Sequence, residues 1–149
     1  MLKNIPETLS PELLKILMEM GHFDEIVIGD ANFPGASRAR NLVRLDGLGS
    51  ARILDDILKF FPLDDIEETC VTVMKVSRKG YGIPPIWEEY KEIIEKRDGK
   101  KDCMAIIPRW DFYERAGRAY AVIATSESAL FANIILTKGI VKKIIEENS

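Results

Sequence analysis

Short apolar strand-like runs alternate with amphipathic helical stretches along most of this chain, and this alternation is the feature that most constrains its fold. The strand-like runs cover residues 25–29, 42–45, 70–76, 103–107, 120–124 and 132–136. Helical spacing predicts helices over 10–20 and 50–61, a third from residue 84 onward, a short one over 112–118 and a tail helix over 141–147. Alternating helices and strands favour an α/β fold, and the strand-rich end indicates a mixed β-sheet flanked by helices. At 149 residues the chain is predicted to be one domain, 1–149, with a short extra C-terminal tail over 141–149.

Charge and composition argue against several functional classes. The net charge of -3 comes from interspersed acids and bases, so no basic stripe marks a nucleic-acid surface. No apolar run approaches the about 20 residues of a membrane span, and the N-terminus lacks the apolar centre of a signal peptide. Cys70 and Cys103 lie inside apolar runs and are expected to be buried thiols in a reducing compartment. We therefore expect a cytoplasmic protein with neither nucleic-acid nor membrane partners.

Short polar signals predict helix starts and solvent positions. Ser10 and Ser50 each precede an apolar helical stripe and are expected to be N-caps. The paired acids Asp55–Asp56 and Asp64–Asp65 lie outside the apolar stripes, so we expect both pairs to face solvent.

His22, the only histidine, follows the first predicted helix and precedes a short strand. Histidine has an unperturbed pKa of about 6.5 and can take or give a proton near neutrality, so His22 is a candidate general acid or base. A histidine just past a helix C-terminus also interacts favourably with the helix dipole without any further role. The spacing alone leaves both interpretations open.

Three other polar residues stand at predicted strand ends. Asp30 follows the strand over 25–29, and Arg109 follows the strand over 103–107. Such positions suit binding groups, but Asp30 could equally form a turn with Asn32, and Arg109 a surface ion pair with Asp111. Asn133 enters an apolar strand, where a polar side chain requires a specific partner.

Six short motifs in a fixed order resemble the fucose mutarotase / ribose pyranase (RbsD/FucU) family over most of the chain, from Ile5 to Ile140. They are LSPELL (9–14), MGHFD (20–24), DANFP (30–34), RLDGL (44–48), FYERA (112–116) and NIIL followed by KG (133–139). The DANFP motif resembles the fucose branch rather than the ribose branch.

The resemblance implies an RbsD-like fold and a cofactor-free, metal-free isomerase of carbohydrate metabolism that interconverts sugar anomers. It implies that His22 is the catalytic residue and that the substrate is bound by Asp30, Arg109 and the segment Phe131, Ala132 and Asn133. It also implies a homo-oligomer, commonly a decamer of two pentameric rings, with active sites shared between neighbouring subunits.

These implications suggest a specific mechanism. His22 would be the main acid/base in opening and closing the sugar ring, while Asp30 would accept sugar hydroxyls and orient the imidazole. Arg109 and Asn133 would hold the ring by hydrogen bonds, and Phe131 would pack on its apolar face. Mutarotation moves only protons and one ring bond, so neither a metal nor a covalent step is needed.

Two departures from the family pattern leave other functions open. The chain has Phe23 where the family usually has glycine, and Phe131 where it usually has tyrosine. One alternative is a D-ribose pyranase, which interconverts pyranose and furanose forms at the same site. A second is a non-catalytic sugar-binding protein, which the hydroxyl missing at Phe131 favours. A third, a metal site of His22, Asp24 and Asp30, fits metal-ligand spacing poorly.

Overall fold

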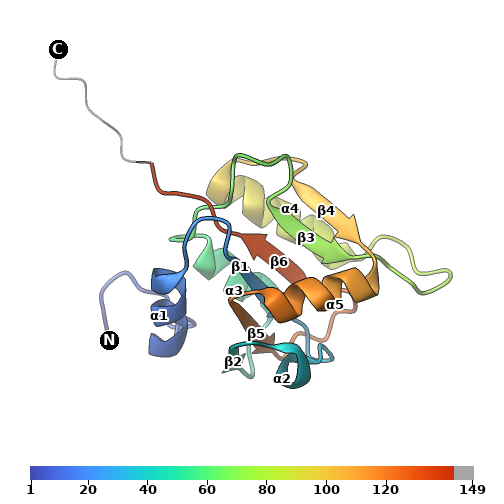
Figure 1. Ribbon diagram of the computed structural model, residues 1–149, viewed down its shortest axis with the longest axis horizontal. Helices are drawn as coiled ribbons and strands as arrows, with labels where there is room; N and C mark the ends of the chain where they lie inside the picture. The colour runs from blue at the N-terminus through green and yellow to red at the C-terminus, as the bar shows by residue number, and fades with distance from the viewer. Residues whose placement is uncertain (143–149) are drawn as a thin grey trace, which may run out of the picture.

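A six-stranded mixed β-sheet forms the centre of the molecule, as the computed structural model of the chain describes it over residues 1–142 (Figure 1). The strands are β1 (Glu25–Gly29), β2 (Leu42–Leu45), β3 (Val71–Met74), β4 (Met104–Ile107), β5 (Ala121–Thr125) and β6 (Ile134–Thr137). Their order in the sheet is β2-β5-β1-β6-β3-β4. All six correspond to predicted strand-like runs: β1 and β2 have the predicted ends, and the ends of the other four differ by at most two residues.

The strand β6 is the exception to an otherwise parallel sheet. It runs antiparallel to both neighbours, β1 and β3, whereas β1, β2 and β5 are parallel to one another and β3 is parallel to β4. This confirms the predicted mixed sheet. Because β6 is reversed, its N-terminal end lies at the end of the sheet where the other strands have their C-termini. Its C-terminal end lies at the opposite end of the sheet.

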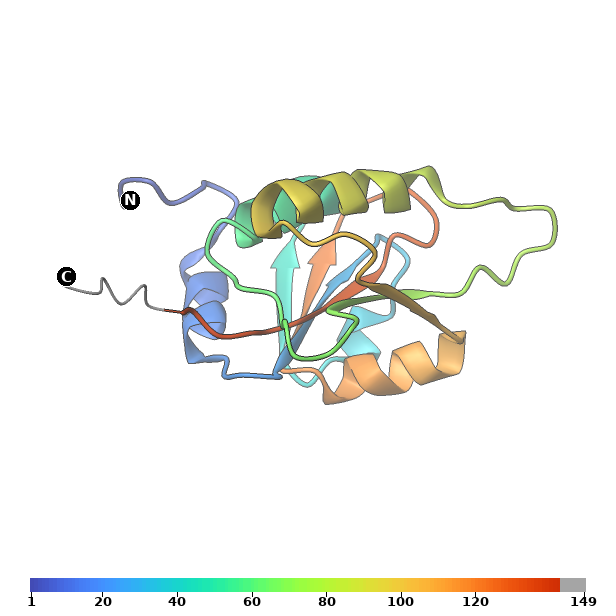
Figure 2. The same ribbon diagram turned by 90° about the horizontal axis from the view of Figure 1, so that it is seen from above.

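Helices cover both faces of the sheet (Figure 2). They are α1 (Pro11–Glu19), α2 (Gly35–Arg38), α3 (Ser50–Ile57), α4 (Pro85–Asp98) and α5 (Arg109–Arg118). Apolar side chains of α1, α3 and α4 pack with one face of the sheet, and those of α5 pack with the other. The buried stripe of α3, Ile53, Leu54 and Ile57, shows why the predicted amphipathic helix forms there.

Several local predictions need correction. The helix predicted over 50–61 ends at Ile57, and its N-cap is Gly49 rather than Ser50. The Ser50 hydroxyl is buried, donates to Glu127 Oε1 at 2.9 Å and lies 2.6 Å from the Tyr90 hydroxyl oxygen. Ser10, in contrast, is confirmed as the N-cap of α1, where its side chain accepts from Leu13 N–H.

The acid pairs and the ends of two helices also differ from expectation. Asp56 and Asp64, expected in solvent, are buried at 6% and 0% exposure. Burial of Asp56 is compensated because it accepts from the Thr8 hydroxyl at 2.6 Å. The last predicted helix before β5 begins at Arg109 rather than at residue 112. The tail helix predicted over 141–147 lies outside the described residues beyond its first two positions, which are not helical. Within residues 1–142, no helix is long and apolar enough to cross a membrane.

Candidate functional site

A cavity of about 500 Å³ lies at the sheet edge where β1, β3 and β4 end and β6 begins. Four of the predicted site residues line it together: Asp30, Arg109, Phe131 and Asn133. They lie far apart in the chain and meet because the reversed strand β6 brings its start to the edge where the parallel strands finish. Ligands of open α/β sheets commonly bind outside the carboxyl ends of the strands, so this cavity is the candidate binding site.

Asp30 is fixed at the floor of the cavity by two hydrogen bonds. Its N–H donates to Asn133 Oδ1 at 2.7 Å, and its carboxylate accepts from Asn32 N–H at 2.9 Å. The second bond forms the turn with Asn32 that the sequence left open as an alternative, and the first supplies the partner expected for Asn133. Burial raises the pKa of Asp30 above its usual value, although N–H groups of the surrounding backbone oppose the shift. Its carboxyl group is therefore a less acidic hydrogen-bond partner than an exposed aspartate.

The segment Phe131–Asn133 is held from the side of helix α4. Trp87 Nε1 donates to the Phe131 carbonyl at 2.8 Å, and the Tyr90 hydroxyl donates to the Ala132 carbonyl at 2.5 Å. Ala132 is fully buried behind the cavity, whereas Phe131 and Asn133 line it. The segment therefore presents an aromatic ring and an amide from a rigid support.

Arg109 is the first residue of α5, and its guanidinium Nη2 donates to Ser77 Oγ at 2.7 Å. This contact takes the place of the ion pair with Asp111 that the sequence left open. Ser77 and Tyr113, which the sequence analysis did not single out, also line the cavity. Ser77 follows β3 at the same edge, so the strand-end rule that found Asp30 could have found it as well. Tyr113 supplies a phenolic hydroxyl, which Phe131 lacks.

His22 lies at the opposite edge of the sheet and does not line the cavity. Its Nε2 is 3.1 Å from Asp64 Oδ1, and 28% of its side chain is exposed. Asp64 also accepts from the N–H groups of Glu67 at 3.1 Å and Ile66 at 3.3 Å. Within one chain the carboxylate beside the imidazole is therefore Asp64, whereas Asp30 follows the other end of β1.

The electrostatics of Asp64 explain how a fully buried carboxylate remains charged. Burial by itself raises its pKa, but the hydrogen bonds from Glu67 N–H, His22 and Ile66 N–H outweigh burial. The net effect is a pKa below the usual value of an aspartate. An ionised Asp64 at neutral pH can accept a hydrogen bond from the imidazole.

The end of β6 brings His22 and Asp64 together. Phe23 N–H donates to the Lys138 carbonyl at 2.9 Å, and Asp64 N–H donates to the Thr137 carbonyl at 2.9 Å. A Cβ at Gly139 would meet the Leu63 carbonyl oxygen at 2.5 Å, so only glycine allows the chain before Asp64 to approach this closely. Backbone pairing therefore positions both members of the pair.

The length of β1 separates the two groups of residues. A strand of five residues spans roughly 16 Å, at about 3.3 Å per residue, and His22 and Asp30 flank its two ends. One monosaccharide cannot touch both residues of the same chain. The same separation prevents His22 and Asp30 from ligating one metal ion within a chain.

Comparisons with known proteins give a consistent result. The model of the RbsD / FucU transport protein family matches residues 3–141. The fucose mutarotase of Homo sapiens is 46% identical over 145 residues, which are 93% of this chain and 94% of that protein. The crystal structure of the Streptococcus pneumoniae fucose mutarotase in complex with L-fucose is 48% identical, with a TM-score of 0.90, and covers 95% of this chain and 100% of that one. RbsD of Bacillus subtilis, solved with D-ribose, is 20% identical with a TM-score of 0.71 over 95% of this chain and 100% of that one, and shares the fold alone.

Replacement of Asp64 tests its interaction with His22 directly. Because its folded-state pKa is lowered, its carboxylate stabilises the fold above the unfolded-state pKa of about 3.9 and loses this effect as the pH falls through the folded-state value. We expect Asp64→Asn to reduce the free energy of unfolding by about 1–3 kcal/mol at pH 7, since charged hydrogen bonds are lost. Urea unfolding measured from pH 7 to pH 3 should show that the difference in unfolding free energy between wild type and Asp64→Asn becomes smaller below about pH 4. The control Asp65→Asn, at an exposed neighbouring residue, should change the free energy of unfolding little. A free-energy difference for Asp64→Asn that does not vary with pH would contradict a lowered pKa for Asp64.

Proposed function

The chain belongs to the RbsD/FucU family, and we propose on this basis that it is a mutarotase that interconverts the α and β anomers of a monosaccharide such as L-fucose. The observation that carries the proposal is the full-length likeness to a fucose mutarotase solved with L-fucose, at 48% identity and a TM-score of 0.90. The likeness to the ribose-binding relative extends to the fold only. The fucose activity is therefore favoured over D-ribose pyranase activity.

The cavity chemistry supports binding of a sugar. Asp30 accepts hydrogen bonds from hydroxyls, while Arg109 and the Asn133 amide can donate to them. The Phe131 ring offers a flat apolar surface to the C–H face of a pyranose. A mixture of aromatic surface and a few placed polar groups is typical of small-molecule sites.

The reaction is a proton relay around one breaking bond. A base removes the proton of the anomeric hydroxyl, an acid delivers a proton to the ring oxygen, and the C1–O5 bond breaks to give the open aldehyde. Rotation about C1–C2 exposes the other carbonyl face, and the reverse steps close the ring. His22 performs the proton transfers, and the Asp64 carboxylate holds the imidazole by its Nε2 atom. No redox cofactor is needed, because the sugar is neither oxidised nor reduced.

The active site is completed by a second copy of the chain. His22 of one subunit lies against the Asp30 cavity of its neighbour, since β1 keeps the two residues apart within one chain. Exposed apolar side chains such as Phe23, Ile106 and Trp110 are suited to a contact between subunits. The assembly is a decamer of two pentameric rings, as the family pattern implies. Two free cysteines agree with a cytoplasmic location.

Exchange between the anomers of L-fucose, followed by proton NMR, tests the proposed activity. Wild type should accelerate the exchange, and His22→Ala should reduce it by about 10²–10⁴-fold, the usual contribution of general acid–base catalysis. Asp65→Asn is the matched control, because it changes an exposed carboxylate beside Asp64 without touching His22. Acceleration of D-ribose ring forms alone would assign the pyranase activity, and saturable binding without acceleration would assign a sugar-binding protein.

Mixed assemblies test whether subunits share the site. His22→Ala and Asp30→Asn should each be inactive, but co-expressed chains purified through two different tags should recover part of the activity. Recovery occurs because an intact His22 from one chain meets an intact Asp30 from the other. The control mixture of His22→Ala with Asp64→Asn should recover nothing, since both changes affect the same half of the site. A mixed assembly of the first pair that stays inactive would contradict the shared site.

A further inference from the structure

The two cysteines lie side by side at the starts of neighbouring parallel strands. Val71 pairs with Met104 in the β3–β4 register, so Cys70 and Cys103, one residue earlier, are cross-strand neighbours. Cys70 N–H donates to the Cys103 carbonyl at 3.0 Å, which holds the two residues side by side. Neighbouring strands lie about 4.8 Å apart, which is within the Cα separations of about 4.4–6.8 Å that a disulfide spans.

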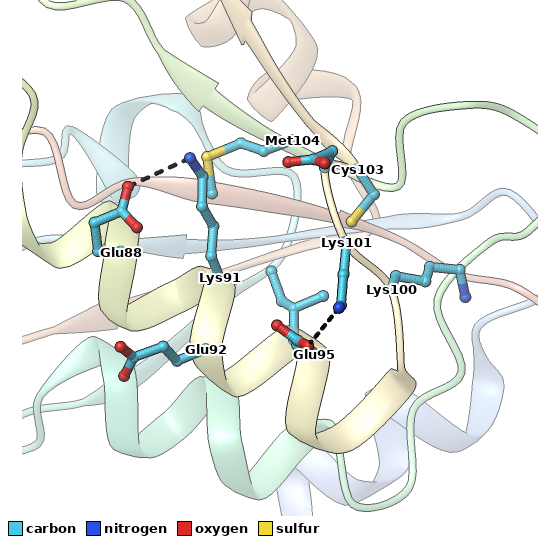
Figure 3. Close-up of a pocket in the computed structure, with 10 residues that line it drawn as sticks. Glu88, Lys91, Glu92, Glu95, Lys100, Lys101, Cys103 and Met104 are labelled. Carbon is cyan, nitrogen blue, oxygen red and sulfur yellow. Dashed lines mark hydrogen bonds and ion pairs between the residues drawn. The ribbon is translucent and has the colours of Figure 1, made fainter.

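The two thiols differ in access to solvent. Cys103 is 7% exposed and lines a cavity of about 240 Å³ between α4 and the start of β4, whereas Cys70 is 1% exposed and does not line it. Figure 3 shows the Cys103 sulfur directed toward the Lys100 and Lys101 side of this cavity. Cys103 is therefore the thiol that a small reagent reaches first.

The two thiols also differ in acidity. The neighbouring Cys70 thiol, assisted by backbone groups and the Lys100 ammonium, lowers the pKa of Cys103 to about 7 against the effect of burial. The same interaction and burial raise the pKa of Cys70. The thiolate is the reactive form of cysteine, so acidity and access favour the same residue.

We propose that Cys103 and Cys70 form a thiol–disulfide exchange site for low-molecular-weight disulfides of the glutathione type. The Cys103 thiolate attacks one sulfur of the small disulfide, whose S–S bond breaks, and the released thiolate takes up a proton. The Cys70 thiol then loses its proton and attacks the Cys103 sulfur, which expels the second small thiol. In sum, the two protein thiols are oxidised by two electrons to one disulfide, and the small disulfide is reduced to two thiols.

Mass spectrometry of the intact full-length chain tests this order of events. After incubation of the folded protein with oxidised glutathione and acid quenching, wild type should lose the mass of two hydrogens. Cys70→Ser should instead gain one glutathione, because the mixed disulfide at Cys103 has no resolving thiol. Cys103→Ser should gain none, since Cys70 does not line the cavity. Glutathione on Cys70 in the folded Cys103→Ser variant, or wild type that reacts only in denaturant, would overturn the proposal; circular dichroism verifies that each variant is folded.

A separate observation concerns Phe23, which neighbours His22. Its backbone φ is 69°, a left-handed conformation that a bulky residue rarely adopts. Its ring stacks on the His22 imidazole with centroids 3.9 Å apart and planes 14° apart, although 47% of Phe23 is exposed. Strained backbone of this kind persists where the surroundings enforce it, and such positions cluster at functional sites.

We infer that Phe23 is a positioning residue for His22, an inference that rests on the proposed mutarotase function. Asp64 holds the imidazole at its edge, through Nε2, while the Phe23 ring covers one of its faces. Together the two contacts leave the imidazole little freedom to rotate. The consequence is an acid/base group held in one orientation before the substrate arrives.

Three substitutions separate this role from a structural one. Phe23→Gly and Phe23→Leu should reduce kcat about ten- to a hundred-fold with little change in KM, and Phe23→Tyr should retain it. His22 is the only histidine, so its ring-proton NMR signals are unique. These signals should lose the ring-current shift caused by the ring at position 23 in Phe23→Gly and Phe23→Leu, and keep it in Phe23→Tyr. Wild-type kcat and unshifted His22 signals in Phe23→Gly would overturn the inference. If wild type itself fails to accelerate anomer exchange, the mutarotase proposal fails, whereas the His22 signals still report whether the stack exists.

Discussion

The reversed strand β6 is the constraint on which the rest of the structure depends. The segment that leads into it places Phe131 and Asn133 beside Asp30. At its other end, the carbonyls of Thr137 and Lys138 accept from the N–H groups of Asp64 and Phe23. A parallel strand in the same position would enter the sheet at the edge where it now leaves it, and both groups of residues would lose their support. One element therefore organises two distant parts of the molecule.

The same geometry explains why a single chain is chemically incomplete under the proposed mechanism. A sheet keeps the two ends of a strand apart, so a general acid at one edge and a binding cavity at the other cannot act on one small molecule. Association of identical chains solves this problem without any change to the fold, because each copy carries His22 at one end of its sheet and the Asp30 cavity at the other. Assembly is then a requirement of catalysis in addition to any effect on stability.

How far the sequence predicts the structure depends on whether a feature is local. Strand positions follow from alternation and were predicted correctly. The turn at Asp30 was one of two alternatives that the spacing of Asp30 and Asn32 left open, and the structure contains it. Asp64 was predicted to face solvent because neighbouring acids usually do, whereas its burial depends on pairing with Thr137, more than 70 positions away. Ser50 was misassigned for a similar reason, since its partners lie on α4 and in the loop before β6. Asp56 was also predicted to face solvent, and its partner Thr8 lies 48 positions away. The mispredicted residues are therefore polar groups whose partners come from distant parts of the chain.

Gly139 and Phe23 show two solutions to backbone crowding around the end of β6. At Gly139 a side chain would collide with the Leu63 carbonyl, and glycine removes the conflict. At Phe23 the left-handed backbone also favours glycine, yet the chain keeps a phenylalanine whose ring lies on the imidazole. Stability alone would select glycine at both positions, because glycine adopts positive φ without steric cost. A strained aromatic residue next to the single histidine is therefore best understood through what its ring does to that histidine.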